Sequence, residues 1–327
     1  MPVRDEHIGV VLFQLGGPDS PNAVEPFLRN LFNDPDIFNF PLAGIVRSIF
    51  ASTISKLRAS KVRRNYSKIG GKSPIGEHTE RQARALEQKL RESIDARVFV
   101  AMRYWKPFSA DAIERLREAN CDRLILLPLF PQYSVASTGS SMNEWRRCVA
   151  RVGFDSPTAL VESYFEAPLY IDSVVDRIRQ ALARFPAHAR PHLVFSAHGL
   201  PLKLIEAGDP YQHQIEQTVR LVVEHGEFDL RHTLCYQSKV GPGRWLQPGL
   251  LPTLEKLGRE GEQAVLVIPI AFVSDHIETL SEIDIEARRD AARWGIHHFE
   301  TMTGLNDSEL FISALAELVL EAVRPSE

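Results

Sequence analysis

Eight short runs of β-branched and apolar residues, separated by helical patterns, constrain the fold of this 327-residue chain more than any other feature. The runs are nearly continuous in hydrophobicity, which is typical of strands covered on both faces in a parallel sheet. They lie at 8–15, 97–104, 123–129, 158–163, 192–197, 232–237, 264–270 and 296–301. Patterns typical of helices lie between them at 79–92, 110–119, 169–184, 212–225 and 277–293. This alternation predicts an α/β fold built from doubly wound parallel sheets.

The length favours two domains, because a domain commonly takes about 100 to 200 residues. Eight strands then give four per domain. We expect an N-terminal domain over 1–130 and a C-terminal domain over 131–327, with the last helix packing back on the first domain. The segment 32–72 has helical pattern and loop but no strand, and we interpret it as a functional lid because ordinary connections are much shorter.

Composition excludes several classes of protein. The formal charge of −4 creates no field that would attract nucleic acid. The three cysteines, Cys121, Cys148 and Cys235, have no C-x-x-C spacing, so a zinc site or a disulfide framework lacks support. We see neither a signal peptide nor an uncharged apolar run of 18 residues. We therefore expect a cytoplasmic protein.

The residues that follow the predicted strands are unusual in kind. Ligands of open α/β sheets bind at the carboxyl ends of strands, so these positions are candidates for a binding site. They are Leu15 to Pro18, Arg103 to Trp105, Pro131 to Ser134, Ser196 to Gly199, Tyr236 to Lys239 with Gly241 to Trp245, and Phe272 to His276. Such aromatic, basic and histidine side chains suit a large flat aromatic ligand that carries carboxylates. No G-x-G-x-x-G or P-loop motif supports a nucleotide, and Ile69 to Ser73 is either an anion cradle or a plain turn.

Two groups of strand-end residues could carry chemistry. His198 follows a strand and precedes Gly-Leu-Pro, and its imidazole could accept protons or bind a divalent metal, although a lone histidine is often structural. Asp275 and His276 precede Glu278, Glu282 and Glu286, whose spacing lines three carboxylates along one helix face. That row is either a landing path for a cation such as Fe²⁺ or a solvated helix face.

The segment 37–50 is largely apolar, and basic residues follow it at Lys56, Arg58, Lys61, Arg63 and Arg64. This pattern fits contact with a membrane surface. It fits equally a helical lid that packs its apolar side on the protein.

The chain resembles the ferrochelatase family nearly from end to end. The likeness is carried by Leu15 to Pro18, Ile69 to Pro74, Pro131 to Ser134, Thr138 to Ser141, Phe195 to Pro201, Gln237 to Pro242 and Ala271 to Leu280. The resemblance implies an enzyme of haem biosynthesis, a lyase that inserts Fe²⁺ into protoporphyrin IX. It also implies two similar Rossmann-like domains, each a four-stranded parallel sheet flanked by helices as in chelatases, with a porphyrin cleft between them.

The resemblance also implies roles for individual residues. His198 and Glu278 would form the catalytic and iron-binding pair, with Asp275, His276, Glu282 and Glu286 as a delivery path on a helix that contains a π-type widening. Leu15, Ser73, Arg103, Tyr104, Tyr133, Trp245 and Phe272 would bind the porphyrin. No cysteine follows Cys235, so we expect no iron–sulfur cluster and no tightly bound cofactor.

Several alternatives remain open from the sequence. Leu15 stands where relatives that use coproporphyrin would carry Tyr, which favours protoporphyrin IX over coproporphyrin III. His198 could be a base or an iron ligand. A non-catalytic haem or porphyrin carrier would need the same aromatic cleft, and a two-domain solute-binding protein would share the sheet pattern. The oligomeric state and the iron donor are not readable from these residues.

Overall fold

The computed structural model describes residues 6–37, 43–239 and 243–324 and divides the chain into two compact units. The first unit comprises Met1–Ser163 with Phe311–Glu327, and the second comprises Tyr164–Leu310. This division differs from the boundary expected at residue 130. The reason is the short strand β4 (Thr158–Leu160), which pairs in parallel with β3 (Arg123–Pro128) and so belongs to the first sheet.

The first unit contains a four-stranded parallel sheet in the order β2-β1-β3-β4. Its central strand β1 (Ile8–Gln14) is buried at every residue, with β2 (Ala96–Met102) on one side and β3 on the other. Burial on both faces explains why the sequence of β1 is apolar without alternation.

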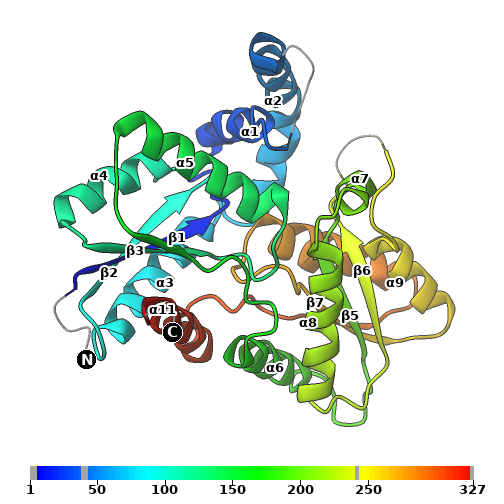
Figure 1. Ribbon diagram of the computed structural model, residues 1–327. Helices are drawn as coiled ribbons and strands as arrows, with labels where there is room; N and C mark the ends of the chain where they lie inside the picture. Colours follow the sequence, from blue (N-terminus) through cyan, green and yellow to red (C-terminus); the bar gives the residue numbers. More distant parts are fainter. Residues whose placement is uncertain (1–5, 38–42, 240–242, 325–327) are drawn as a thin grey trace. The chain divides into compact units, whose positions relative to one another are not determined.

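Helices cover both faces of this first sheet. The helices of the first unit are α1 (Val24–Phe32), α2 (Ala43–Ser67), α3 (Ile75–Leu90), α4 (Ser109–Ala119), α5 (Ser140–Val152) and α11 (Glu309–Val323). Of these, α2 packs on α1. Figure 1 shows α4 and α5 on one side of the sheet and α3 and α11 on the other. On the α4 and α5 side, Phe13 meets Trp145 edge to face, with ring centroids 5.4 Å apart. The Arg123 guanidinium donates to the carbonyls of Ala322 and Val323 and thereby caps the last turn of α11.

The second unit repeats the architecture of the first. Its parallel sheet has the order β6-β5-β7-β8, formed by β5 (His192–His198), β6 (His232–Gln237), β7 (Ala264–Ile268) and β8 (His298–Thr301). Its helices are α6 (Pro168–Leu182), α7 (Leu202–Glu206), α8 (Tyr211–His225), α9 (Leu250–Arg259), the π-helix η3 (Glu278–Ala287) and α10 (Arg288–Arg293). Two four-stranded parallel sheets flanked by helices confirm the predicted fold class.

The strand order creates a switch point in each sheet. The chain leaves β1 for β2 on one side and then crosses back to β3 on the other, and β5, β6 and β7 repeat this path. The crossovers on the two sides of the central strand run in opposite directions, which leaves a crevice at the carboxyl ends of β1 and β3, and of β5 and β7. The residues that leave these four strands are therefore the best placed to bind a ligand.

The segment 32–72 contains no strand among its described residues, and α2 occupies 25 of its positions. Residues 38–42 of the expected lid and 240–242 of the Gln237 to Pro242 motif lie outside the described residues. Within the part of the chain that the structure describes, no helix has the length and apolar character needed to cross a membrane.

Candidate active site

His198 and Glu278 meet at the switch point of the second sheet. His198 ends β5, and Glu278 begins η3 after the loop that follows β7. His198 Nδ1 lies 3.0 Å from Glu278 Oε2, and the side chains are 34% and 16% exposed. The Tyr211 hydroxyl donates to the His198 carbonyl at 3.0 Å and fixes the end of the strand. His198 and Glu278, which are 80 positions apart in the chain, are thus in direct contact.

Three donors converge on one oxygen of Glu278. Besides His198, the Gln237 Nε2 amide and the Ser238 hydroxyl donate to Oε2 at 3.1 and 2.8 Å. The Ser196 hydroxyl donates to Gln237 Oε1 at 2.7 Å and so turns the amide nitrogen toward Glu278. The other oxygen, Oε1, has no hydrogen-bond donor among the described residues and lies 3.9 Å from His276 Nε2.

Charge and burial oppose each other at this pair. Burial raises the pKa of Glu278, but the charge and hydrogen bond of His198 outweigh it and hold that pKa below its ordinary value. Burial lowers the pKa of His198, and the same pairing with Glu278 raises it above its ordinary value of 6.5. Glu278 is therefore ionised near neutral pH, and its charge favours the protonated form of His198.

Ser238 links Glu278 to the next acidic residue of the row. It follows β6 with φ of 62°, in the left-handed region that few non-glycine residues adopt. Its Oγ lies 2.8 Å from Glu278 Oε2 and 2.8 Å from Glu282 Oε2. A hydroxyl has one proton to donate, so the two contacts are both hydrogen bonds only when Glu282 carries a proton itself. Burial and the charge of Glu278 raise the pKa of Glu282 to about 7, which agrees with that proton count.

Glu286 continues the acidic row along η3, which has the π-type widening that the resemblance implied. The charge of Glu286 contributes to the raised pKa of Glu282. The wider i to i+5 hydrogen bonding of a π-helix often marks a functional site. The row is thus electrostatically coupled, and its first two members lie mostly inside the protein.

Asp275 and His276 differ from each other in their surroundings. The Asp275 carboxylate accepts hydrogen bonds from Thr279, Gly304 and Asn306, so it anchors the loop after β7 rather than facing a cation. His276 is 5% exposed, and its Nδ1 lies 3.1 Å from the Ser274 carbonyl. A carbonyl only accepts, so Nδ1 carries the proton and Nε2 presents a lone pair toward Glu278. Burial lowers the pKa of His276, which keeps the ring neutral.

Two aromatic residues expected to bind porphyrin lie in the second unit. Phe272 stands edge-on to His198, with centroids 6.2 Å apart, and contacts His276 at 4.5 Å. Trp245 is half-buried, and its indole Nε1 is buried without a hydrogen-bond partner. Its ring also lies 3.7 Å from the position that a Cβ on Gly199 would take. The same Cβ would lie only 2.9 Å from the Gln237 carbonyl oxygen, so Gly199 permits the close approach of the two strand ends beside His198.

Leu15, Ser73 and Tyr133 belong to the switch-point region of the first unit. Leu15 leaves β1 half-buried, and Tyr133 leaves β3 half-buried. Ser73 is 6% exposed, and its backbone N–H donates to the Pro18 carbonyl at 2.8 Å. A Cβ on Gly17 would lie 2.5 Å from Ser73 Cβ, so this contact requires glycine. The turn at 69–73 is thereby fastened to the exit of β1.

Arg103 and Tyr104 have partners within the first unit that the sequence did not reveal. Asp34, which follows α1, accepts the Tyr104 hydroxyl at 2.6 Å and the Ser140 hydroxyl at 2.5 Å, and it pairs with Arg103 at 2.9 Å. Tyr104 is 1% exposed. Their strand-end position suggested ligand contact, but the buried Asp34 carboxylate engages them both.

Gln237 and Ser238 were among the strand-end candidates but had no predicted role, and Asp34 was not singled out from the sequence. The signal for the first two was their place at the end of β6, whereas no sequence pattern pointed to Asp34. In the described ranges, no group of three or more His, Cys, Asp or Glu residues is arranged to hold a metal ion.

The chain is similar in sequence to one known protein family over nearly its whole length. The family model described as Ferrochelatase matches residues 7–323. Proteins named ferrochelatase from Geotalea daltonii, Aquifex aeolicus and Synechocystis sp. are 45%, 45% and 43% identical to the chain. Those matches cover 96%, 96% and 97% of the chain and 97%, 99% and 82% of the respective relatives.

Solved structures add support for the fold. SirB from Bacillus subtilis with Fe³⁺ aligns with a TM-score of 0.57 at 10% identity, covering 97% of this chain and 96% of that one. CbiX, described as the terminal enzyme for siroheme biosynthesis in denitrifying bacteria, aligns with a TM-score of 0.50 at 14% identity, covering 97% of this chain and 100% of that one. From the full-length family match and these identities, the chain belongs to the ferrochelatase family.

Proposed function

We propose that this member of the ferrochelatase family inserts Fe²⁺ into protoporphyrin IX, forming haem and releasing two protons. The observation that carries the proposal is the hydrogen bond between His198 Nδ1 and Glu278 Oε2. It supplies a proton acceptor and an anionic group side by side at a sheet switch point, which metal insertion needs and mere porphyrin binding does not.

We assign His198 as the general base. A carboxylate only accepts, so the neutral ring keeps its proton on Nδ1 and leaves the lone pair on Nε2. That nitrogen can take a pyrrole proton, since part of the ring is exposed. Pairing with Glu278 raises the pKa of His198, which makes the imidazole a stronger proton acceptor.

We assign Glu278, His276, Glu282 and Glu286 to the iron. Glu278 Oε1 and His276 Nε2 are both lone-pair atoms, 3.9 Å apart, and oxygen with imidazole nitrogen suits Fe²⁺. An Fe²⁺ ion near Glu278 would weaken the pull of the carboxylate on His198. The imidazolium would then lose its proton as the metal arrives, which links metal capture to the readiness of the base.

We assign the porphyrin contacts of the first unit to Leu15, Ser73 and Tyr133, and those of the second to Trp245 and Phe272. The proposal omits Arg103 and Tyr104 because Asp34 holds them. Binding a distorted macrocycle better than a flat one lowers the barrier to metal entry, because the metal enters only when the ring bends and its protons leave.

His198→Ala should fold and bind protoporphyrin IX with near-normal affinity, because the proposed ring contacts remain. Its kcat for metal insertion should fall by roughly 10²- to 10⁴-fold, the usual contribution of a general base. Zinc insertion followed by fluorescence measures the rate, and His188→Ala, at an exposed position, is the matched control. A His198→Ala protein that inserts metal at the rate of the unaltered enzyme would sink the assignment.

Changing Glu282 and Glu286 to Gln should raise the KM for Fe²⁺, because each substitution keeps the shape and removes a carboxylate. We expect an increase of up to about tenfold per residue, equivalent to about 1.4 kcal/mol. Porphyrin affinity should stay constant, and Asp284→Asn on the same helix serves as the control because Asp284 pairs with Arg288. A KM for Fe²⁺ that does not change in these variants would show that Glu282 and Glu286 are only part of a solvated helix face.

Leu15→Tyr tests the choice of porphyrin. The unaltered enzyme should have a higher kcat/KM with protoporphyrin IX than with coproporphyrin III. The tyrosine, which is larger and carries a hydroxyl, should reduce or invert this ratio. Steady-state assays with both porphyrins measure it, and a preference of the unaltered enzyme for coproporphyrin III would contradict the substrate assignment while leaving the metal-insertion site intact.

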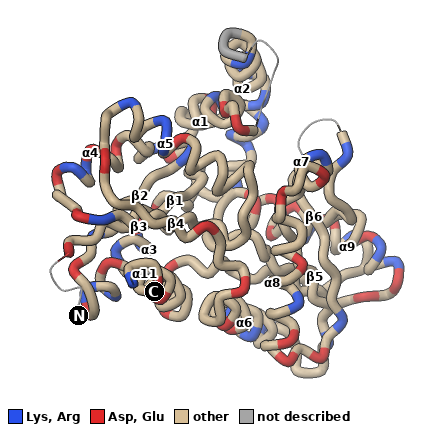
Figure 2. Tube along the Cα trace, viewed as in Figure 1, with Lys and Arg blue, Asp and Glu red and all other residues tan. Residues whose placement is uncertain are grey.

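We further propose that the beginning of α2 contacts an anionic membrane surface, where the poorly soluble porphyrin partitions. Val46, Ile49 and Leu57 are 48%, 61% and 74% exposed, and Figure 2 shows basic positions recurring along α2. Exposed apolar side chains beside basic residues are typical of interfacial helices.

Replacing Val46 and Ile49 with Ser should reduce co-sedimentation with anionic liposomes and leave the fold unchanged, because both side chains are largely exposed. Leu251→Ser, at an exposed position on α9, is the control. Equal liposome binding by the double variant and the control would show that α2 makes no membrane contact.

A further inference from the structure

The first unit contains a polar cavity whose lining residues have no role in the proposed reaction. It has a volume of about 560 Å³, within the range of small-molecule sites. Residues from the end of α1, the first turn of α2, the first turn of α4 and one face of α5 line it. All of these belong to the first unit, whereas His198 and Glu278 belong to the second.

Arginine dominates the charge of this cavity. Four guanidinium groups line it, against the carboxylates of Asp34 and Glu144. The four are Arg47, Arg103, Arg147 and Arg151. Arg103 pairs with Asp34 at 2.9 Å, and Arg147 pairs with Glu144 at 2.9 Å. Arg147 also pairs with Asp36 at 2.8 Å. Three carboxylates therefore accompany Arg103 and Arg147, and with Arg47 and Arg151 the cluster keeps one excess positive charge.

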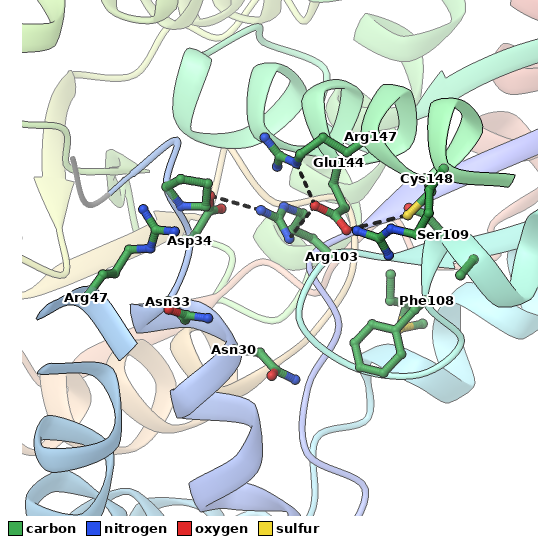
Figure 3. Close-up of a pocket in the computed structure, with 14 residues that line it drawn as sticks. Asn30, Asn33, Asp34, Arg47, Arg103, Phe108, Ser109, Glu144, Arg147 and Cys148 are labelled. Carbon is green, nitrogen blue, oxygen red and sulfur yellow. Dashed lines mark hydrogen bonds and ion pairs between the residues drawn. The ribbon is translucent and has the colours of Figure 1, made fainter. Parts of the chain in front are cut away.

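Arg47 and Arg151 supply the unmatched charge. Neither forms an ion pair or a hydrogen bond within the described residues, and Arg47 Nε is buried without a partner. A buried charged donor that lacks a partner is costly, so its retention needs a reason. Figure 3 shows Arg47 on one side of the pocket and the α5 residues Glu144, Arg147 and Cys148 on the other.

The first turn of α4 adds to the positive potential. Ser109 and Ala110 begin this 11-residue helix and line the cavity. The amino end of a helix carries a partial positive charge, which favours anions. The side-chain amides of Asn30 and Asn33 offer further hydrogen bonds at the wall.

The geometry points to a binding site for a small polyanion that carries at least two carboxylate or phosphate groups. Two unmatched guanidiniums on different helices call for two anionic groups rather than one. Guanidinium groups are the side chains best suited to such groups because they donate in a planar fork. An anionic metabolite bound in this cavity would stabilise the first unit, whereas the residues assigned to iron belong to the second unit.

Isothermal titration calorimetry with pyrophosphate and with citrate, at constant ionic strength, tests this site on the full chain. We expect one ligand per chain and no comparable binding of acetate. Arg47→Gln and Arg151→Gln should each weaken binding at least tenfold, which is about 1.4 kcal/mol. Arg146→Gln is the matched control, because Arg146 lies on α5 and does not line the cavity. Metal insertion without polyanion should be unchanged in all three variants.

Three results would overturn the proposal. The first is that neither polyanion binds. The second is that Arg146→Gln loses as much affinity as Arg47→Gln and Arg151→Gln, which would show that only the overall charge matters. The third is that protoporphyrin IX displaces the polyanion, which would assign the cavity to the carboxylates of the porphyrin. Circular dichroism of the variants separates loss of the site from loss of the fold.

Discussion

The carboxylate of Glu278 is the group on which the site of the second unit depends. A mostly buried charge of this kind is tolerated only when donors compensate it, and three converge on a single oxygen. That compensation orients His198, positions the Gln237 amide and brings Ser238 between two acidic residues. It also leaves the other oxygen without a donor among the described residues. One ionised group thus fixes the tautomer of the neutral His198 ring and keeps one carboxylate oxygen without a donor.

The two units share one topology and differ in the chemistry at their switch points. At the first, glycine-dependent packing of Ser73 on Gly17 and the half-buried Leu15 and Tyr133 give a mainly neutral edge. At the second, histidine and glutamate side chains give an edge that exchanges protons near neutral pH. The first kind of edge suits contact with a large apolar ring, whereas the second suits handling of protons and metal. The proposed function predicts this difference between two units of the same topology, because it needs one surface for the ring and another for protons and metal.

Much of the fold could be predicted because parallel strands buried on both faces read as continuous apolar runs, as β1 and β5 do. The compact units divide near residue 163 rather than near the expected residue 130, because β4 has only three residues and gains its place through pairing with β3, which no local pattern encodes. His198 and Glu278 could be found from their strand-end positions. The contacts of Ser238 and Asp34 could not be predicted, because their partners are 40 or more positions away in the chain. For the same reason, the contacts of Arg103 and Tyr104 with Asp34 could not be predicted.

The central claim is that Glu278 makes His198 a base with its free nitrogen at Nε2. Nitrogen-15 NMR of the His198 ring across pH measures both the tautomer and the pKa directly. The account predicts a neutral ring protonated on Nδ1, a pKa above 6.5, and a lower pKa in Glu278→Gln. A neutral ring protonated on Nε2, or a pKa that does not change in Glu278→Gln, would contradict it.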